Sequence, residues 1–150
     1  MRPSLKAIER VPAADPPGTL LGTLTLPFED RCKRRLRAHL DDGREIAIAL
    51  PYGPALRDGD RLRTSDGSQV EVRSAGEDVS TARSSDALRL ARAAYHLGNR
   101  HVALEIAPGL LRWAHDHVLD DMVRKLGLEV VAEHCAFEPE AGAYAEGHAH

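Results

Sequence analysis

The sequence predicts an α+β protein with an N-terminal all-β domain, a ferredoxin-like βαββαβ domain and a flexible C-terminal tail. Before residue 75, short alternating segments are separated by turns rich in Gly and Asp, which is typical of a compact β domain. After residue 76, two segments with apolar residues at helical spacing alternate with strand-like segments. The last residues contain Pro, Gly and small side chains. We therefore expect domains at 1–75 and 76–136, followed by a tail at 137–150.

Bulk composition narrows the possible classes of protein. A chain of 150 residues that is 43% hydrophobic can form one ordinary domain or two small ones. Only 4% of the residues are aromatic, so the core must be built from Leu, Val, Ile and Ala. The net charge of −3 and the pI near 6.2 argue against a general nucleic-acid binder.

The sequence also favours a cytoplasmic location without a membrane partner. No apolar run reaches the length of about 18 residues that a membrane span needs. The first residues lack the apolar centre of a signal peptide. Cys32 and Cys135 lie far apart and form no CxxC pair, so a reducing compartment is the simplest interpretation.

The β domain is expected to follow a leader at residues 3–18. This leader contains four of the nine prolines and is predicted to be extended or loosely docked. Turns are expected where Gly, Asp or Pro cluster between strands rich in apolar and β-branched residues. The expected strands are 19–26, 45–50, 61–64 and 69–73.

A basic segment, residues 31–40, lies within this domain. If it is extended, four basic side chains share one face, because side chains alternate along a strand. These are Arg31, Lys33, Arg35 and Arg37. Two interpretations remain open: a solvated strand face, or a docking surface for an acidic partner.

The second domain combines two helices with four strands. Residues 84–86 supply cap residues for the first helix, which Gly98 or Asn99 can close in the left-handed conformation. Asp116 can cap the second helix, with Gly127 just after its end. The expected strands are 77–82, 102–106, 110–113 and 128–132. The resulting β-α-β-β-α-β order is that of the ferredoxin-like unit.

Histidines concentrate in the second domain and at the C-terminus. Four of the eight lie between residues 96 and 117, and two more are His148 and His150. Neutral imidazole is the commonest protein ligand for borderline metals such as nickel, zinc and copper. This concentration predicts a protein that handles a metal ion, either as a carrier or as a catalyst.

Three motifs in the chain resemble the signature of the UreE family of urease accessory proteins. They lie, in the family's order, at residues 94–101, 116–122 and 137–144. The first contains Gly-Asn-Arg-His and ends at His101, and the third begins with Phe-Glu-Pro-Glu. Weaker similarity in the β domain extends the resemblance from about Leu24 to the end of the chain.

The resemblance implies a homodimeric nickel metallochaperone that delivers Ni(II) to apo-urease and is not itself an enzyme. It also implies a peptide-binding type of β domain and a ferredoxin-like domain that binds metal and pairs with a second subunit. In the family, the histidine that ends the first motif, here His101, comes from both subunits to one nickel ion. The usual partners are the GTPase UreG and the complex of urease with its accessory proteins.

Four further histidines are candidate ligands by the same resemblance: His115, His117, His148 and His150. The last two correspond to tail histidines of the family, and some members have ligands where the first two stand. In an extended backbone, His115 and His117 would face the same way and could share a metal ion. The alternative makes Asp116 a helix cap and His117 a surface residue.

Other metal-binding side chains receive no ligand role. His96 ends a helix, where an imidazolium suits the helix dipole, and His39 is remote from the motifs. Cys135 is a possible soft ligand, but a lone buried thiol is commoner. Thiolate ligation would favour zinc or Cu(I) over Ni(II). Ala136 stands where the family usually has a proline, and the long His-rich tail of some members is absent.

Two other functions remain open. A metal-dependent hydrolase could use His115-x-His117 with a carboxylate, although the chain has no HExxH motif. A metal-independent interaction module would act through the basic segment. Zinc and copper are also expected to bind in vitro, copper more strongly than nickel.

Overall fold

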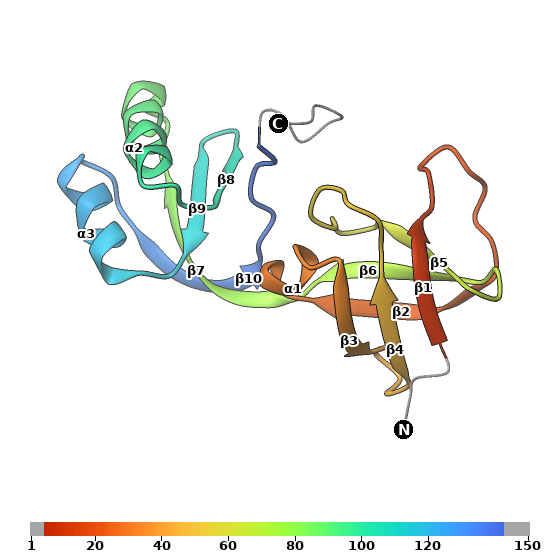
Figure 1. The fold of residues 1–150 in the computed structure, drawn as a ribbon. Helices are drawn as coiled ribbons and strands as arrows, with labels where there is room; N and C mark the ends of the chain where they lie inside the picture. The colour runs from red at the N-terminus through yellow and green to blue at the C-terminus, as the bar shows by residue number, and fades with distance from the viewer. Residues whose placement is uncertain (1–4, 143–150) are drawn as a thin grey trace. The chain divides into compact units, whose positions relative to one another are not determined.

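The computed structural model describes residues 5–142 and divides the chain into two compact units. Of the described residues, 5–75 together with Ala141 and Gly142 form the N-terminal unit, and Gly76 to Glu140 form the C-terminal unit. Each unit has its own sheet and its own hydrophobic core (Figure 1). The predicted α+β class, with a strand-rich first domain and a ferredoxin-like second domain, is confirmed.

The described part of the N-terminal unit is a six-stranded sheet with one short helix. In chain order the elements are β1 (Leu5–Arg10), β2 (Leu20–Leu26), α1 (Phe28–Arg31), β3 (Arg35–His39), β4 (Glu45–Ala49), β5 (Arg61–Thr64) and β6 (Gln69–Ser74). The strands lie in the order β2-β6-β5-β1-β4-β3, with β1 parallel to β4 and β2 parallel to β6. Alternate residues of these strands, such as Leu24, Ile46 and Leu62, are fully buried in an aliphatic core.

The predicted leader contains β1: the expectation of an extended segment holds there, but that of a loosely docked leader outside the domain is wrong. β1 lies inside the sheet, parallel to β4 on one side and antiparallel to β5 on the other. Ala7 is fully buried between exposed neighbours, as expected for a strand with one face on the core. The prolines that made residues 3–18 resemble a loop mostly follow the strand, at Pro12, Pro16 and Pro17.

The basic segment at 31–40 is a strand only in part. Arg31 ends α1 and is 1% exposed. Its buried guanidinium is satisfied by hydrogen bonds that it donates to the backbone oxygens of Leu26 and Leu56. β3 begins at Arg35, so Arg35 and Arg37 share an exposed face without Arg31. The prediction of one four-residue basic face is therefore wrong.

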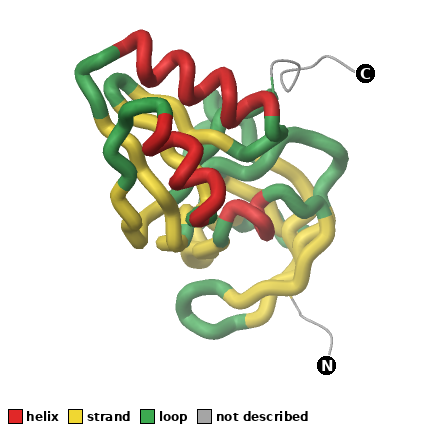
Figure 2. The backbone as a smooth tube through the Cα atoms, turned by 90° about the vertical axis from the view of Figure 1, so that its left-hand side faces the viewer, coloured by secondary structure: helices red, strands yellow, loops and turns green. Residues whose placement is uncertain are grey.

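The described part of the C-terminal unit has a four-stranded sheet and two helices. Its elements are β7 (Gly76–Arg83), α2 (Ala87–Asn99), β8 (Leu104–Ala107), β9 (Leu110–Ala114), α3 (His117–Lys125) and β10 (Val131–Ala136). The order β10-β7-β9-β8, antiparallel throughout, is that of a split βαβ fold. Both helices lie on the same face of the sheet (Figure 2), where Leu97, Trp113 and Val123 are fully buried. Neither helix, nor α1, has the length and apolar character needed to cross a membrane.

The last strand starts later than expected. Gly127, with φ of 94°, reverses the chain after α3, and Leu128 is then buried in the core instead of pairing in the sheet. Residues 137–140, assigned to the tail, pack onto the C-terminal unit. The amides of Glu138 and Glu140 donate to Glu105 Oε1 and to Leu104 O at 2.7 Å each.

Candidate metal centre

His101 follows the end of α2 and has a left-handed backbone. Among the described non-glycine residues, it alone has a positive φ, of 56°. A Cβ atom makes this conformation cost roughly 1–2 kcal/mol, which is why helices often end on glycine at this position. The expectation that Gly98 or Asn99 would be left-handed is wrong, because both belong to α2.

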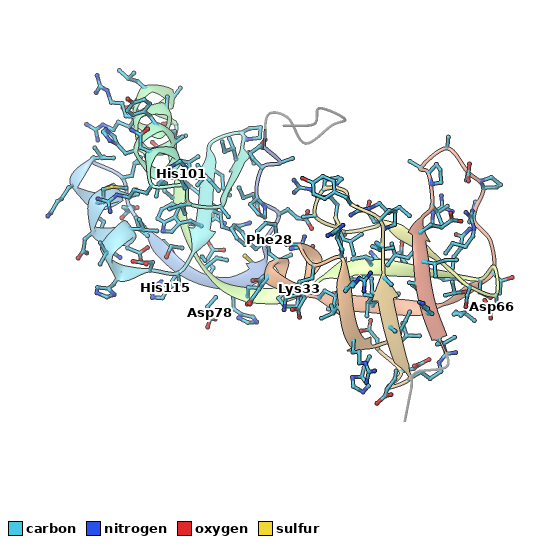
Figure 3. All side chains as sticks on the ribbon, viewed as in Figure 1. Phe28, Lys33, Asp66, Asp78, His101 and His115 are labelled. Carbon is cyan, nitrogen blue, oxygen red and sulfur yellow. The ribbon has the colours of Figure 1, made fainter. Side chains whose placement is uncertain are left out.

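The side chain of His101 is exposed at this strained position (Figure 3). Glycine would satisfy the backbone with less strain, so local stability does not explain a histidine at this position. Strained non-glycine residues cluster at functional sites. Backbone and exposure together make His101 the leading candidate for a ligand.

His115 directly follows β9, and its ring is held at one nitrogen atom, Nδ1. Its Nδ1 lies 3.0 Å from Ser80 Oγ and 3.3 Å from Asp120 Oδ2. Asp120 is 3% exposed, and its other oxygen accepts a hydrogen bond from Trp113 Nε1 at 3.0 Å. The side chain of His115 itself remains 48% exposed. One edge of the ring is thus anchored to the interior while the rest is accessible.

His117 is the first residue of α3. The carboxylate of Asp116 accepts hydrogen bonds from the amides of Val118 and Leu119 at 2.8 and 3.2 Å, which confirms its role as the helix cap. Asp116 has an extended backbone, with φ of −157°. An extended residue between two others lets both face the same side. The cap role of Asp116 is therefore compatible with metal binding by His115 and His117.

Pairing of β8 with β9 brings the two histidine segments to the same end of the sheet. Leu104, the first residue of β8, pairs with Trp113 near the end of β9. His101 precedes the first and His115 follows the second, so both segments leave the sheet at that end. Within residues 5–142, no three His, Cys, Asp or Glu side chains form a metal-binding group. His148 and His150 lie outside the described residues.

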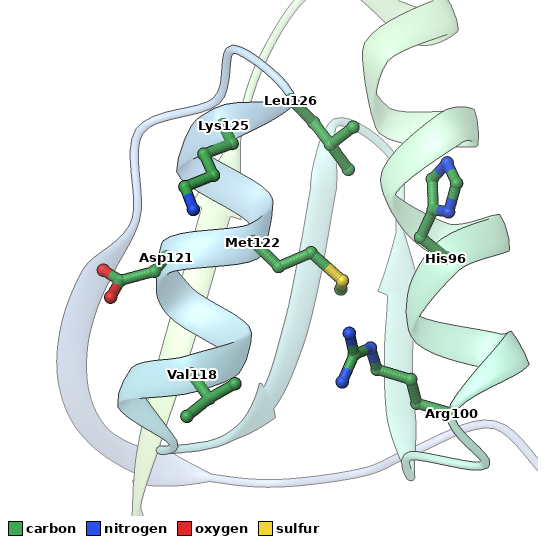
Figure 4. A pocket seen from close by; sticks show the side chains of 7 residues that line it. All are labelled: His96, Arg100, Val118, Asp121, Met122, Lys125 and Leu126. Carbon is green, nitrogen blue, oxygen red and sulfur yellow. The ribbon is translucent and has the colours of Figure 1, made fainter.

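His96 lies at a different feature, a surface pocket of about 480 Å³ between α2 and α3 (Figure 4). Met122 points from α3 toward His96 on α2 and toward Arg100, the residue directly after α2. The pocket has a single carboxylate, from Asp121, beside the cations Arg100 and Lys125. Neither His101 nor His115 lines it, and its charge is unsuited to a metal cation.

The remaining side of the sheet carries an ion-pair network. Arg83 pairs with Glu133 at 2.5 Å and lowers the pKa of that carboxyl group, and Arg112 pairs with Glu105 at 3.0 Å. This network contains no histidine. A separate pair joins His134 Nδ1 to Asp78 Oδ1 at 2.9 Å, between register partners of β10 and β7.

Comparison with known proteins covers both units. Residues 5–75 match the model of the UreE urease accessory protein N-terminal domain, and residues 77–150 match that of its C-terminal domain. The chain belongs to the UreE family. It is 59% identical over 140 residues to the urease accessory protein UreE of Alkalilimnicola ehrlichii, an alignment that covers 93% of this chain and 84% of that protein.

Other UreE proteins are similarly close. The chain is 60% identical over 131 residues to UreE of Pseudomonas putida, covering 87% of this chain and 81% of that protein. It is 55% identical over 136 residues to UreE of Citrobacter koseri, covering 89% and 90%. UreE proteins are urease accessory proteins by name, so membership of the family implies a role in urease maturation.

The three UreE-like motifs fall on connected parts of the C-terminal unit. The first covers the end of α2 and His101, the second covers the cap and most of α3, and the third begins with the packed residues 137–140. Sequence reasoning missed two residues of this site, Ser80 and Asp120. Asp120 lies within the second motif, but its burial and its contact with His115 depend on pairing across the fold.

Proposed function

We propose that this UreE-family protein is a homodimeric nickel metallochaperone that delivers Ni(II) for assembly of the urease active site. The observation that carries the proposal is the exposed imidazole of His101 on a strained, left-handed residue. A residue beside a two-fold axis contributes twice to one site, so a dimer can build a metal centre from few ligands per subunit.

Exposed apolar side chains on the two helices support pairing of the C-terminal units. Leu88 and Tyr95 on α2 are 58% and 66% exposed, and Val118 on α3 is 54% exposed. Large apolar side chains in solvent are favourable to bury against a second copy. The dimer would supply the ligands that a single described chain lacks.

A carrier fits this arrangement better than an enzyme. His101, His115 and His117 all lie where a helix or strand begins or ends, at positions accessible to solvent. Accessible nitrogen ligands favour binding and release of an ion, whereas metal-dependent hydrolysis needs an enclosed site with a placed base. His148 and His150 of the C-terminal tail are proposed as further ligands that help to capture the ion.

The proposed partners follow from the role in urease maturation. They are a UreG-type GTPase and the complex of urease with its accessory proteins, in the cytoplasm. Nickel is the proposed cargo, and zinc and copper are expected to compete for the same nitrogen ligands in vitro.

Equilibrium dialysis combined with analytical ultracentrifugation tests the proposal. We expect about one tightly bound Ni(II) per dimer, because a two-fold site uses one histidine from each subunit. His101→Ala should abolish tight binding. His96→Ala is the control, because His96 is an exposed residue of α2 in the same motif, and it should leave tight binding intact. Unchanged nickel stoichiometry in His101→Ala would refute the assignment of the ligand. Absence of nickel binding in the unmodified protein would favour an interaction module that acts through Arg35 and Arg37.

A further inference from the structure

Asp120 is a buried carboxylate without a Lys or Arg partner among the described residues. It lies on α3 at 3% exposure, and no Lys or Arg in the described chain forms an ion pair with it. A buried carboxylate is costly unless its oxygens are hydrogen-bonded or paired. One oxygen of Asp120 accepts from Trp113 Nε1 at 3.0 Å, and the other faces His115 Nδ1 at 3.3 Å. Its burial is therefore compensated by a tryptophan and a histidine.

This contact selects between the two neutral forms of His115. A lone pair on Nδ1 would be repelled by the carboxylate 3.3 Å away, whereas an N–H there is attracted to it. Ser80 Oγ, fully buried and 3.0 Å from the same nitrogen, can accept that N–H. The neutral ring then carries its proton on Nδ1 and its lone pair on Nε2.

The other edge of the ring, with Nε2, makes no hydrogen bond or ion pair in the described chain. The side chain of His115 is 48% exposed, and the contacts that hold it in the described chain involve Nδ1. Histidine ligands of metals usually donate their second ring N–H to a carboxylate or other oxygen, which fixes the tautomer and the direction of the ring. His115, Ser80 and Asp120 have this arrangement before any metal is bound.

We propose that Asp120, together with Ser80, is a positioning residue that holds His115 with Nε2 presented as a ligand for nickel. The proposal rests on the proposed nickel function and extends it to residues that do not touch the ion. The two proposed ligands are then oriented in different ways. Side-chain contacts with Asp120 and Ser80 orient His115, whereas the left-handed backbone positions His101.

Asp120→Asn provides a near-isosteric test. The amide oxygen can still accept from Trp113 Nε1, but an amide N–H then faces His115 Nδ1 and favours a lone pair there. Long-range ¹H–¹⁵N spectra of the metal-free protein at about pH 8, where an ordinary imidazole is neutral, report the tautomer directly. We expect the Nδ1–H form in the unmodified protein and the Nε2–H form in Asp120→Asn. The signals of His115 are identified by their loss in His115→Ala.

Asp121→Asn is the matched control. It removes the same charge from the next position of α3, but Asp121 is 65% exposed and pairs only with Arg124 at 3.3 Å in the described structure. Neither the tautomer of His115 nor its response to nickel should change. Trp113 fluorescence and circular dichroism verify that both variants remain folded.

Titration with NiCl₂ tests the ligand role in the same spectra. Substoichiometric Ni(II) should broaden the ring signals of His115 through paramagnetic relaxation, and Asp120→Asn should need roughly 10–100-fold more free nickel for the same effect. An Nε2–H tautomer in the unmodified protein, or an unchanged tautomer in Asp120→Asn, would overturn the proposal. Broadening of His101 without His115 would also overturn it while leaving the nickel function intact. Broadening of neither would reject both.

Discussion

At His101, the backbone and the side chain favour different residues. A φ of 56° favours glycine, whereas the proposed nickel site requires an imidazole. The chain has the less stable residue at this position. Stability and metal binding should therefore respond in opposite directions to one substitution.

We predict that His101→Gly stabilises the protein by about 1 kcal/mol, because the left-handed strain is removed. Urea denaturation monitored by circular dichroism measures the gain, and equilibrium dialysis should show loss of tight nickel binding. Asn99→Gly is the control, since it adds a glycine at the last residue of α2 without relieving strain. It should lower stability and leave nickel binding unchanged. An equal or lower stability of His101→Gly would show that the left-handed residue is not strained.

Candidate residues of the proposed site could be picked out from the sequence only where a local motif marks them. His101 ends a recognisable segment, and Asp116 is recognisable as a cap from the residues that follow it. The contact between His115 and Asp120 depends on the packing of α3 against β7 and β9, and Ser80 is 35 residues away from His115. Spacing along the chain carries no signal for such a contact.

At the scale of elements, Asp41 connects two strands that lie at opposite edges of the N-terminal sheet, β2 and β3. It follows β3, and its amide donates to Thr23 O of β2 at 2.9 Å. Its carboxylate accepts hydrogen bonds from the hydroxyl groups of Thr23 and Thr25, the latter at 2.9 Å. These bonds, first that of Thr23, lower the pKa of Asp41 below its usual value.

A lowered pKa makes this connection pH-dependent. The folded state favours the ionised carboxylate, so its contribution is complete above the unfolded pKa of about 3.9 and is lost as the pH falls through the lower folded value. We predict that Asp41→Asn is destabilising at pH 7 and that the difference from the unmodified protein disappears in strong acid. Urea denaturation across this pH range measures it. A difference that does not vary with pH would show that ionisation of Asp41 contributes nothing to stability.

Strands and helices with a regular spacing of apolar residues or a recognisable helix cap could be predicted. Strands whose bounds depend on pairing with distant segments could not. The order of strands and helices in the C-terminal unit followed from Asp86, Asp116 and the apolar spacing between them. β1 was missed because prolines after it dominate the local composition. β10 was placed too early because Leu128, apolar and next to a valine-rich segment, enters the core instead of the sheet.

At the scale of the whole molecule, the two units have separate cores, and the sole tryptophan belongs to one of them. Trp113 is fully buried in the C-terminal core. Its fluorescence therefore reports unfolding of that unit, whereas circular dichroism reports both.

We predict that Leu62→Ala, a cavity in the N-terminal core, destabilises that unit by roughly 2–5 kcal/mol. The circular dichroism transition should split or shift to lower urea, while the Trp113 fluorescence transition stays in place. Leu97→Ala, in the C-terminal core, is the reciprocal control and should move the fluorescence transition. Coincident shifts of both signals in Leu62→Ala would mean that the units unfold as one.

The two-domain organisation was predictable from the whole sequence because the hydrophobic period changes near residue 75. The composition of the proposed metal centre was not predictable, since no group of three His, Cys, Asp or Glu side chains that could hold a metal ion forms within residues 5–142. Ligands that the proposed second subunit would contribute leave no pattern in one chain that gives their number or geometry.

The place of β1 inside the N-terminal sheet has a consequence for biosynthesis. Leu5–Arg10 is synthesised before its partners β4 and β5, which extend to Ala49 and Thr64. During translation, β1 therefore has neither partner strand until most of the unit has been synthesised. Peptides or fusion tags joined directly to β1 would therefore act on a strand inside this sheet and not on an edge strand.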